Sequence, residues 1–172
     1  MSLYVGLISD THGVFGEPFR EFFSPVDVIW HAGDWGGDEA FVRSITEFKP
    51  VVGVHGNCDG AFVRYEYPAY QMMKVGGLTV VMTHIGGSPG HYYPRARQLL
   101  DTYKPDVFIC GHSHILKIMN DRQRSLLYVN PGAAGLQGWQ IVRTALRFRI
   151  GEGGVKDMEV FEYPKNSSIF AD

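Results

Sequence analysis

The chain has few of the features that mark secreted, membrane-spanning or nucleic-acid-binding proteins. Its two cysteines, Cys58 and Cys110, are too few to form a disulfide framework. With 16 basic and 18 acidic side chains the formal net charge is −2, which argues against stable binding of nucleic acid. No apolar run is long enough to span a membrane, and no basic segment precedes the first strand pattern. We therefore expect a cytoplasmic protein with no membrane partner.

Length and composition predict one globular domain. A chain of 172 residues, 45% of them hydrophobic, is large enough to bury a core without disulfides. It contains no internal repeat, no low-complexity segment and no linker that would mark a second domain. We therefore expect a single domain over residues 1–172, with residues 166–172 as a loosely held tail. The sequence does not decide between a monomer and a homo-oligomer.

The clearest chemistry lies in Gly111-His112-Ser113-His114, which follows an apolar run at residues 107–110 that is typical of a buried strand. Two histidines separated by one residue point to the same face of a strand, or to two neighbouring points if the chain turns after Gly111. Imidazole is a common ligand of divalent transition metals. Histidines near a strand end are also common as ordinary polar loop residues, so the pair alone is ambiguous.

The first third of the chain alternates between strands and helices. Apolar runs at residues 3–8, 26–30 and 51–54 predict buried strands. Phenylalanines at helical spacing between residues 15 and 23 predict one helix, and apolar residues after Asp38, a predicted N-cap, indicate the next. This order implies a parallel sheet with right-handed crossovers.

The remainder predicts hairpins around one further helix. Residues 70–75 and 78–82 flank a two-glycine turn, and residues 94–103 have helical spacing after Pro94. A glycine-rich loop at residues 85–93 lies between them. A second hairpin follows around residues 121–124, and alternating polarity predicts two final strands at residues 145–150 and 159–163.

Polar side chains follow five of the predicted strands. Each taken singly has a plain structural alternative, because Asp10, Asp34 and Asn57 could cap the helices that follow them. In open α/β sheets, however, ligands bind beyond the carboxyl ends of the strands. The seven candidate metal ligands are Asp10, His12, Asp34, Asn57, His84, His112 and His114.

Seven ligands are too many for one ion, since about six donors fill an octahedral shell. They suit two ions that share a bridging carboxylate. Two divalent ions together with the negative charges of Asp10 and Asp34 leave a net charge of +2 at the site, which favours binding of a phosphate oxyanion. Such a pair, about 3.5–4 Å apart, can hold a hydroxide and stabilise an in-line attack at phosphorus.

These motifs, in this order, resemble the calcineurin-like metallophosphoesterase superfamily, and the small size is similar to its compact prokaryotic phosphodiesterases. The resemblance implies an α/β (α+β) fold in four αββα layers, with two mixed β-sheets flanked by helices. The motifs are Asp10-Thr11-His12, Gly33-Asp34, Gly56-Asn57-Cys58-Asp59, Thr83-His84, Gly111-His112-Ser113-His114 and Asn130-Pro131-Gly132.

Carried over by motif, the resemblance implies that Asp10, His12 and His114 bind one metal ion. Asn57, His84 and His112 would bind the other, with Asp34 bridging. It further implies hydrolysis of a small phosphodiester, with catalytic roles for Asp34, Asn57 and His84. The metals would be divalent, with Mn²⁺ expected first and Fe, Ni, Co or Zn open, since all accept such ligands.

Two departures from the family pattern bear on the substrate. Many members carry a histidine after the Gly-Asn pair, where this chain has Cys58, and a neutral thiol is a poor general acid. The resemblance therefore favours diesters or activated esters. His84 is often followed closely by Gly-His, whereas here His91 comes seven residues later. We expect Asn57, Cys58 and His91 to line the substrate site.

A second functional class stays open. The small metallophosphoesterase-fold subunit of the retromer coat resembles these enzymes but binds partners without turnover. A scaffold can lose ligands freely, whereas this chain retains all seven, so an enzyme is favoured. Among the other polar residues, His31 and His55 are expected to support the site rather than bind metal. Asp59 fits either a turn or an orienting role, Cys110 a buried apolar role, and Trp35, Tyr92 and Tyr93 either a pocket wall or packing under a loop.

Overall fold

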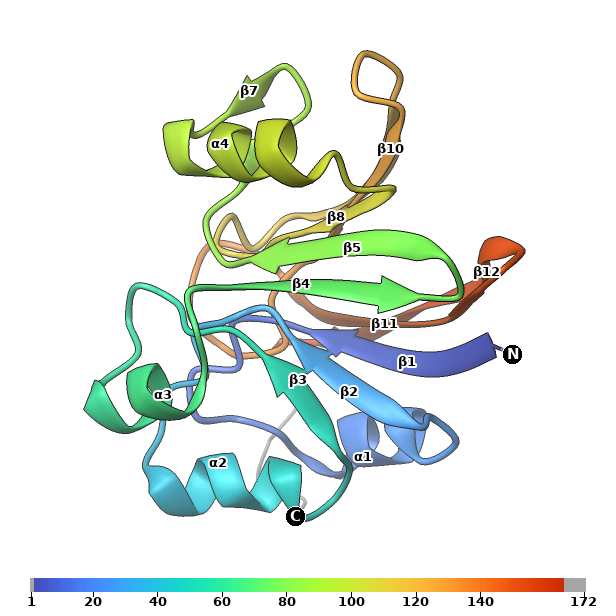
Figure 1. Cartoon of the computed structure of the whole chain (residues 1–172). Coiled ribbons are helices and arrows are strands. Elements are labelled where there is room, and N and C mark those ends of the chain that lie inside the picture. Colours follow the sequence, from blue (N-terminus) through green and yellow to red (C-terminus); the bar gives the residue numbers. More distant parts are fainter. Residues whose placement is uncertain (1, 166–172) are drawn as a thin grey trace.

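The computed structural model describes residues 2–165, so the predicted tail at 166–172 lies outside the described residues. Two five-stranded mixed sheets pack face to face, with helices on both outer faces (Figure 1). The predicted four-layer αββα arrangement is thus confirmed. None of the described helices is long and apolar enough to cross a membrane.

The first sheet contains the three parallel strands predicted from the start of the chain. They are β1 (Ser2–Ile8), β2 (Val28–His31) and β3 (Val51–Gly53). The two long carboxyl-terminal strands, β11 (Val142–Gly151) and β12 (Gly154–Pro164), extend it antiparallel beyond β1. The strand order is β12-β11-β1-β2-β3.

The second sheet has the order β4-β5-β8-β10-β9 and contains both predicted hairpins. Its outer pairs are antiparallel and its three central strands are parallel. The five strands are β4 (Tyr70–Val75), β5 (Leu78–Thr83), β8 (Val107–Ile109), β10 (Leu126–Pro131) and β9 (Leu116–Asp121).

Three of the four described helices match the sequence prediction. Helix α2 (Glu39–Thr46) begins after Asp38, whose side chain accepts a hydrogen bond from the Phe41 amide at 2.9 Å, as expected for an N-cap. Helix α1 (Glu17–Phe23) begins two residues after Phe15, and α4 (Pro94–Tyr103) begins at Pro94.

One short helix and two short strands were not predicted. Helix α3 (Ala61–Glu66) has six residues and buries only Val63, so it has no apolar periodicity to detect. Strands β6 (Gly87–Ser88) and β7 (His91–Tyr92) form a two-stranded hairpin within the glycine-rich loop. With two residues each, they are too short for an alternating pattern.

Three apolar clusters hold the layers together. The largest lies between the sheets and includes Leu7, Trp30 and Phe148, all at most 1% exposed. A second joins the outer face of the first sheet to α1 and α2, and a third joins the second sheet to α4. The arrowheads of β1, β2, β3 and β5 lie on the same side of the molecule (Figure 1). The residues that follow these strands are therefore brought to one edge.

Candidate metal centre

Asp10 is fully buried directly after β1, and one of its two carboxylate oxygens is already hydrogen-bonded. Oδ2 accepts from the Ser9 hydroxyl at 2.6 Å and from the His112 amide at 3.1 Å. These bonds fix the rotation of the carboxylate. They leave Oδ1 facing the Nε2 atom of His114 at 3.1 Å.

Asp34 follows β2 and has the same division of roles between its two oxygens. Oδ1 accepts from the Cys58 amide at 2.8 Å, which ties this carboxylate to the turn after β3. Oδ2 lies 3.2 Å from Nε2 of His84 and 3.9 Å from Nε2 of His12. Asp34 therefore lies between histidines that were predicted to bind different ions.

Two histidines present a defined nitrogen to this cluster. His84 is nearly fully buried, and its Nδ1 lies 2.7 Å from the Ala32 carbonyl oxygen, which can only accept. Nδ1 of His114 lies 3.2 Å from Oε1 of Gln140. Each Nδ1 therefore carries the hydrogen, so that in the neutral ring Nε2 offers its lone pair to the cluster.

Three buried polar atoms at this edge have no hydrogen-bond partner among residues 2–165: Oδ1 of Asp10, Nε2 of His12 and Nε2 of His84. Buried polar groups are nearly always paired, because an unpaired one costs about 1–3 kcal/mol. All three are ligand atoms for divalent metals. The donor set therefore fits a metal centre, and a bound cation would satisfy these atoms.

The backbone at the site is in an uncommon conformation. Five candidate ligands have positive φ, a region that non-glycine residues rarely enter: Asp10, His12, Asp34, His112 and His114, with φ from 46° to 67°. Each such residue costs about 1–3 kcal/mol, and such strain concentrates at functional sites.

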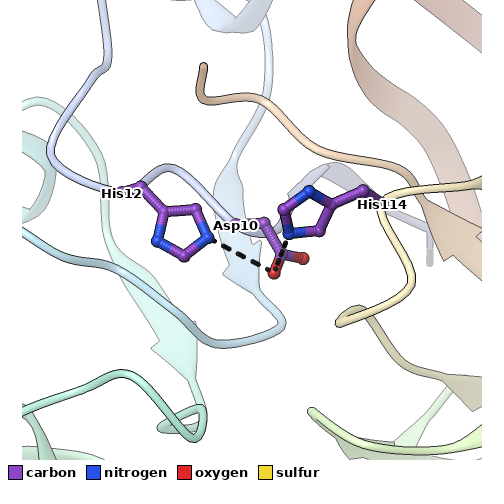
Figure 2. Close-up of side chains that lie close together, drawn as sticks. All are labelled: Asp10, His12 and His114. Atoms are coloured by element: carbon purple, nitrogen blue, oxygen red, sulfur yellow. Dashed lines mark ion pairs between the residues drawn. The ribbon is translucent and has the colours of Figure 1, made fainter. Parts of the chain in front are cut away.

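The ligand atoms form two compact groups. Asp10, His12 and His114 converge as the first predicted set, with their ligand atoms within 4.8 Å of one another (Figure 2). Asp34, His84 and His112 form the second, within the same distance. That Asp34 bridges two ions stays a prediction.

Asn57 and Cys58 lie on the exposed turn after β3, next to these groups. Nδ2 of Asn57 donates to Sγ of Cys58 at 3.4 Å, and the Asn57 side chain lines a cavity together with His84. Sγ of Cys58 lies within 4.8 Å of the ligand atoms of His12 and Asp34. Cys58 is thus beside the metal centre, consistent with its predicted place in the substrate site.

The electrostatics favour a charged carboxylate at Asp34. Burial alone would raise its pKa, but the contacts of its two oxygens with His84 and with the Cys58 amide hold this pKa well below its usual value. For His84, burial lowers the pKa, yet the 3.2 Å contact with Asp34 and the charges of Asp10 and Asp34 raise it overall. In His114 the 3.1 Å contact with Asp10 outweighs burial and raises the pKa. The cluster therefore attracts positive charge.

The supporting residues lie where the sequence suggested. His31 is buried, stacks on Trp35 at 3.8 Å between ring centroids, and bonds to Thr11 through Nε2. Nδ1 of His55 is 2.9 Å from the Tyr67 carbonyl oxygen. Asp59 accepts from the Gly56 amide within its own turn and from the Gly36 amide in the loop after β2, so it stabilises the turn and joins it to that loop.

Of the three aromatic residues with two possible roles, two pack in the interior and one lines a cavity. Trp35 and Tyr92 are buried, whereas Tyr93 is 53% exposed and lines a cavity. Cys110 is buried as expected, although its thiol also donates to the Tyr128 hydroxyl at 3.2 Å. His91 is exposed on β7 and lines a second cavity beside His112.

Sequence reasoning missed two residues that orient the ligands. Ser9 precedes Asp10 directly but carries no motif of its own. Gln140 lies 26 residues after His114, on a loop whose course no pattern indicates. Only the tertiary structure brings this carboxamide to the imidazole.

We expect Gln140→Ala to weaken metal binding about tenfold, because His114 loses the acceptor that fixes its tautomer. Metal titration by calorimetry measures this affinity. The matched control is Gln137→Ala, an exposed side chain in the same loop, which should bind metal normally. Equal affinities in both variants would contradict the orienting role.

Comparison with known proteins agrees with this geometry. A sequence profile of the calcineurin-like phosphoesterase superfamily domain matches residues 3–153. No curated protein matches the chain.

Among solved structures, one similar fold is the solution NMR structure of a Thermotoga maritima protein, with 22% identity, 94% of this chain and 99% of that chain covered, and a TM-score of 0.69. Vps29 from Chaetomium thermophilum has 17% identity, 94% and 97% coverage and a TM-score of 0.68. A predicted phosphoesterase from Streptococcus pneumoniae has 17% identity, 95% and 99% coverage and a TM-score of 0.62. These likenesses establish the fold, and with the profile match over most of its length the chain belongs to the calcineurin-like phosphoesterase superfamily.

Proposed function

We propose that this protein is a metal-dependent phosphoesterase that hydrolyses a small phosphodiester. The observation that carries the proposal is the set of buried ligand atoms on Asp10, His12 and His84 that have no hydrogen-bond partner among the described residues. A protein with no use for a cation would be destabilised by these atoms. The zinc complex of Vps29 from Entamoeba histolytica, at 18% identity, is consistent with metal binding on this fold.

Asp10, His12 and His114 would hold one divalent ion, and Asn57, His84 and His112 the other, with Asp34 shared. When bound, such ions supply Lewis acidity and lower the pKa of water. Mn²⁺ is our first choice, and the nitrogen and oxygen ligands equally accept Fe, Co, Ni or Zn.

The chain's own groups define how a phosphate would be held. Asp10 and Asp34 contribute two negative charges, so two divalent ions would leave a net +2 for the substrate. Asn57 is exposed at the rim and offers an amide N–H to a phosphate oxygen. The hydrogen bond from Nδ1 of His84 to the Ala32 carbonyl fixes the orientation of the ring, so that Nε2 faces the metal centre.

Cys58 makes a diester the favoured substrate. Burial and the charge of Asp34 raise the pKa of its thiol. A neutral thiol of raised pKa donates a proton poorly to a departing alkoxide. Esters with good leaving groups need no such proton, and their hydrolysis should suffer least.

The test uses bis-p-nitrophenyl phosphate with added Mn²⁺. Release of p-nitrophenol is expected, with loss on chelation and recovery on adding metal back. Fe, Co, Ni and Zn are tested in parallel. Absence of turnover with every metal, in protein shown to bind them, would contradict the proposal.

A partner-binding role is the second candidate, and two observations favour it. One solved relative is Vps29 of Chaetomium thermophilum in complex with a cyclic peptide. In the present chain, Trp139 and Ile141 are almost fully exposed in the segment that carries Gln140, beside His114. Exposed apolar residues of this size are typical of contact surfaces. Metal binding alone does not separate the two classes, since Vps29 from Entamoeba histolytica also forms a zinc complex. The turnover assay described above decides between them.

Replacing Cys58 by His is expected to raise monoesterase activity relative to diesterase activity about tenfold, since a positioned general acid contributes roughly 10²–10⁴-fold and the new ring is not optimised. The ratio of kcat/KM for an alkyl monoester over an aryl diester measures the effect. Cys58→Ser, which adds no acid, is the control. An unchanged ratio with both metals retained would assign substrate choice to the loop at residues 85–93.

A further inference from the structure

A cavity of about 520 Å³ opens beside the metal centre and shares His84 and Asn57 with it. Its other walls come from the turn after β3, from α3, and from the start of α4, which lie on the side where β5 ends (Figure 1). The volume is within the range of small-molecule sites. We call it the arm cavity, lined by side chains that include Arg64, Ile85, Tyr93 and Arg95.

One wall of the arm cavity, formed by Arg64 and the turn after β3, is held in place by hydrogen bonds. Nε of Arg64 donates to the Asp59 carbonyl at 2.7 Å, and Nη2 donates to the carbonyls of Gly56 and Asn57 at 3.1 and 3.2 Å. The guanidinium thus braces the turn that carries Asn57. A preformed wall reduces the entropy lost on binding.

The loop that ends in Tyr93 is also anchored. The Tyr128 hydroxyl donates to the Gly87 carbonyl at 2.6 Å, and the Tyr92 hydroxyl donates to the buried Asp121 carboxylate at 2.8 Å. These bonds attach the β6–β7 hairpin, and with it Tyr92 and the next residue Tyr93, to strands β9 and β10 of the second sheet. The half-exposed ring of Tyr93 lines the arm cavity as a planar apolar surface.

The charge in the arm cavity is of one sign. It is lined by Arg64 and Arg95, and no Asp or Glu is among its described lining residues. Arginine is suited to phosphate and carboxylate groups, and tyrosine to flat rings. The metal centre alone accounts for one phosphate. Because the Arg64 guanidinium is engaged by backbone carbonyls, Arg95 is the group that can meet a second negative charge.

We propose that the arm cavity binds one ester group of the phosphodiester, and that this group carries an aromatic ring and a second negative charge. Tyr93 would contact the ring and Arg95 the second charge, while the reacting phosphate lies at the metal centre. A nucleoside bearing an additional phosphate has this chemistry. The inference rests on the proposed phosphodiesterase function and names its substrate class.

A second cavity lies on the other side of Tyr93, lined by His91, His112 and Lys117 among others. It contains one lysine and two serines where the arm cavity has two arginines. The lysine ammonium group is a point charge, whereas the planar guanidinium of arginine can donate two parallel hydrogen bonds to a phosphate or carboxylate. The arm cavity is therefore the better match.

The test compares two chromogenic diesters that differ only in one phosphate. They are the p-nitrophenyl ester of thymidine 5′-phosphate and the same ester with an added 3′-phosphate, both with the Mn²⁺-loaded protein. The 3′-phosphate is expected to raise kcat/KM about tenfold through a charge-assisted contact with Arg95. In Arg95→Gln this ratio should fall close to one.

Two further variants make the result specific. Arg97→Gln, an exposed arginine one residue beyond Ala96 that does not line the arm cavity, should keep the wild-type ratio. In Tyr93→Ala, kcat/KM for the thymidine ester should fall about tenfold relative to kcat/KM for methyl p-nitrophenyl phosphate. The second ester carries a methyl group where the first carries the nucleoside, so it offers no ring to Tyr93. Loss of the ratio in Lys117→Gln but not in Arg95→Gln would overturn the assignment to the arm cavity.

Binding to metal-free protein separates this inference from the proposed function. Thymidine 3′,5′-bisphosphate should bind at least about tenfold more tightly than thymidine 5′-phosphate by calorimetry, and Arg95→Gln should remove the difference. Turnover of methyl p-nitrophenyl phosphate with no preference for the 3′-phosphate overturns the arm cavity alone. Absence of all turnover overturns the proposed function, and the binding experiment then decides on the cavity.

Discussion

Replacing Asp34 by Asn is expected to remove metal from the protein and to lower phosphodiester hydrolysis more than about 100-fold. The carboxylate has one oxygen fixed by the Cys58 amide, and the other faces His84 and His12. In the amide, the oxygen must stay with the Cys58 N–H. The NH₂ group would then face the metal position, where it has no lone pair to donate.

The Asp34→Asn protein should remain folded, because the bond to Cys58 survives and the volume is unchanged. Removal of one carboxylate also relieves repulsion with Asp10. Elemental analysis gives the metal content, and circular dichroism the fold. Two metal equivalents at full activity in this variant would show that the site is assigned wrongly.

Asp27→Asn is the matched control. Asp27 was expected within the second strand, but β2 begins at Val28, so Asp27 lies just before it. Its side chain is exposed and accepts from the Tyr4 amide at 2.8 Å. The variant changes the same charge far from the metal centre. Metal content and hydrolysis should both be unaffected.

The fold was largely predictable because the apolar strand runs and the polar motifs that follow them indicate the same arrangement. Runs such as residues 3–8 and 107–110 are continuously apolar, since both faces of each sheet are covered. Polar residues directly after such runs, as at Asp10 and Asp34, then fall at one edge. The motif order adds the second sheet, which strand periodicity alone does not fix.

Other features of the site depend on tertiary contacts that no local pattern encodes. Gln140 reaches His114 across 26 residues, and Arg64 lies on a six-residue helix with too little apolar surface to be detected. The left-handed backbone at His112 and His114 also has no sequence signal, because histidine does not require it. These parts of the site emerge only from the packed chain.

Two glycines, Gly56 and Gly60, flank the turn that carries Cys58, and only Gly56 is packed against the metal centre. A Cβ atom on Gly56 would fall closer to Oδ1 and the amide nitrogen of Asp34 than any real Cβ approaches another atom. One on Gly60 would meet nothing within 4 Å. Gly56 is glycine because the turn after β3 must touch the Asp34 carboxylate.

Gly56→Ala is therefore expected to push this turn away from Asp34 and to break the bond from the Cys58 amide, which is 2.8 Å long. Overpacking of a buried position costs about 1–3 kcal/mol of stability. Because the displaced carboxylate belongs to the metal centre, metal affinity should fall about 100-fold, equivalent to about 2.7 kcal/mol. Calorimetric titration and the thermal unfolding midpoint measure the two effects.

Gly60→Ala separates the contact from the general effect of adding a methyl group in this turn. Gly60 is the N-cap of α3 and has open space around it, so alanine there should cost less than about 1 kcal/mol and leave metal binding unchanged. If Gly56→Ala also bound metal with wild-type affinity, the Cys58 amide would not be what orients Asp34. The difference between the two variants thus measures how much of the metal affinity comes from holding one carboxylate oxygen in place.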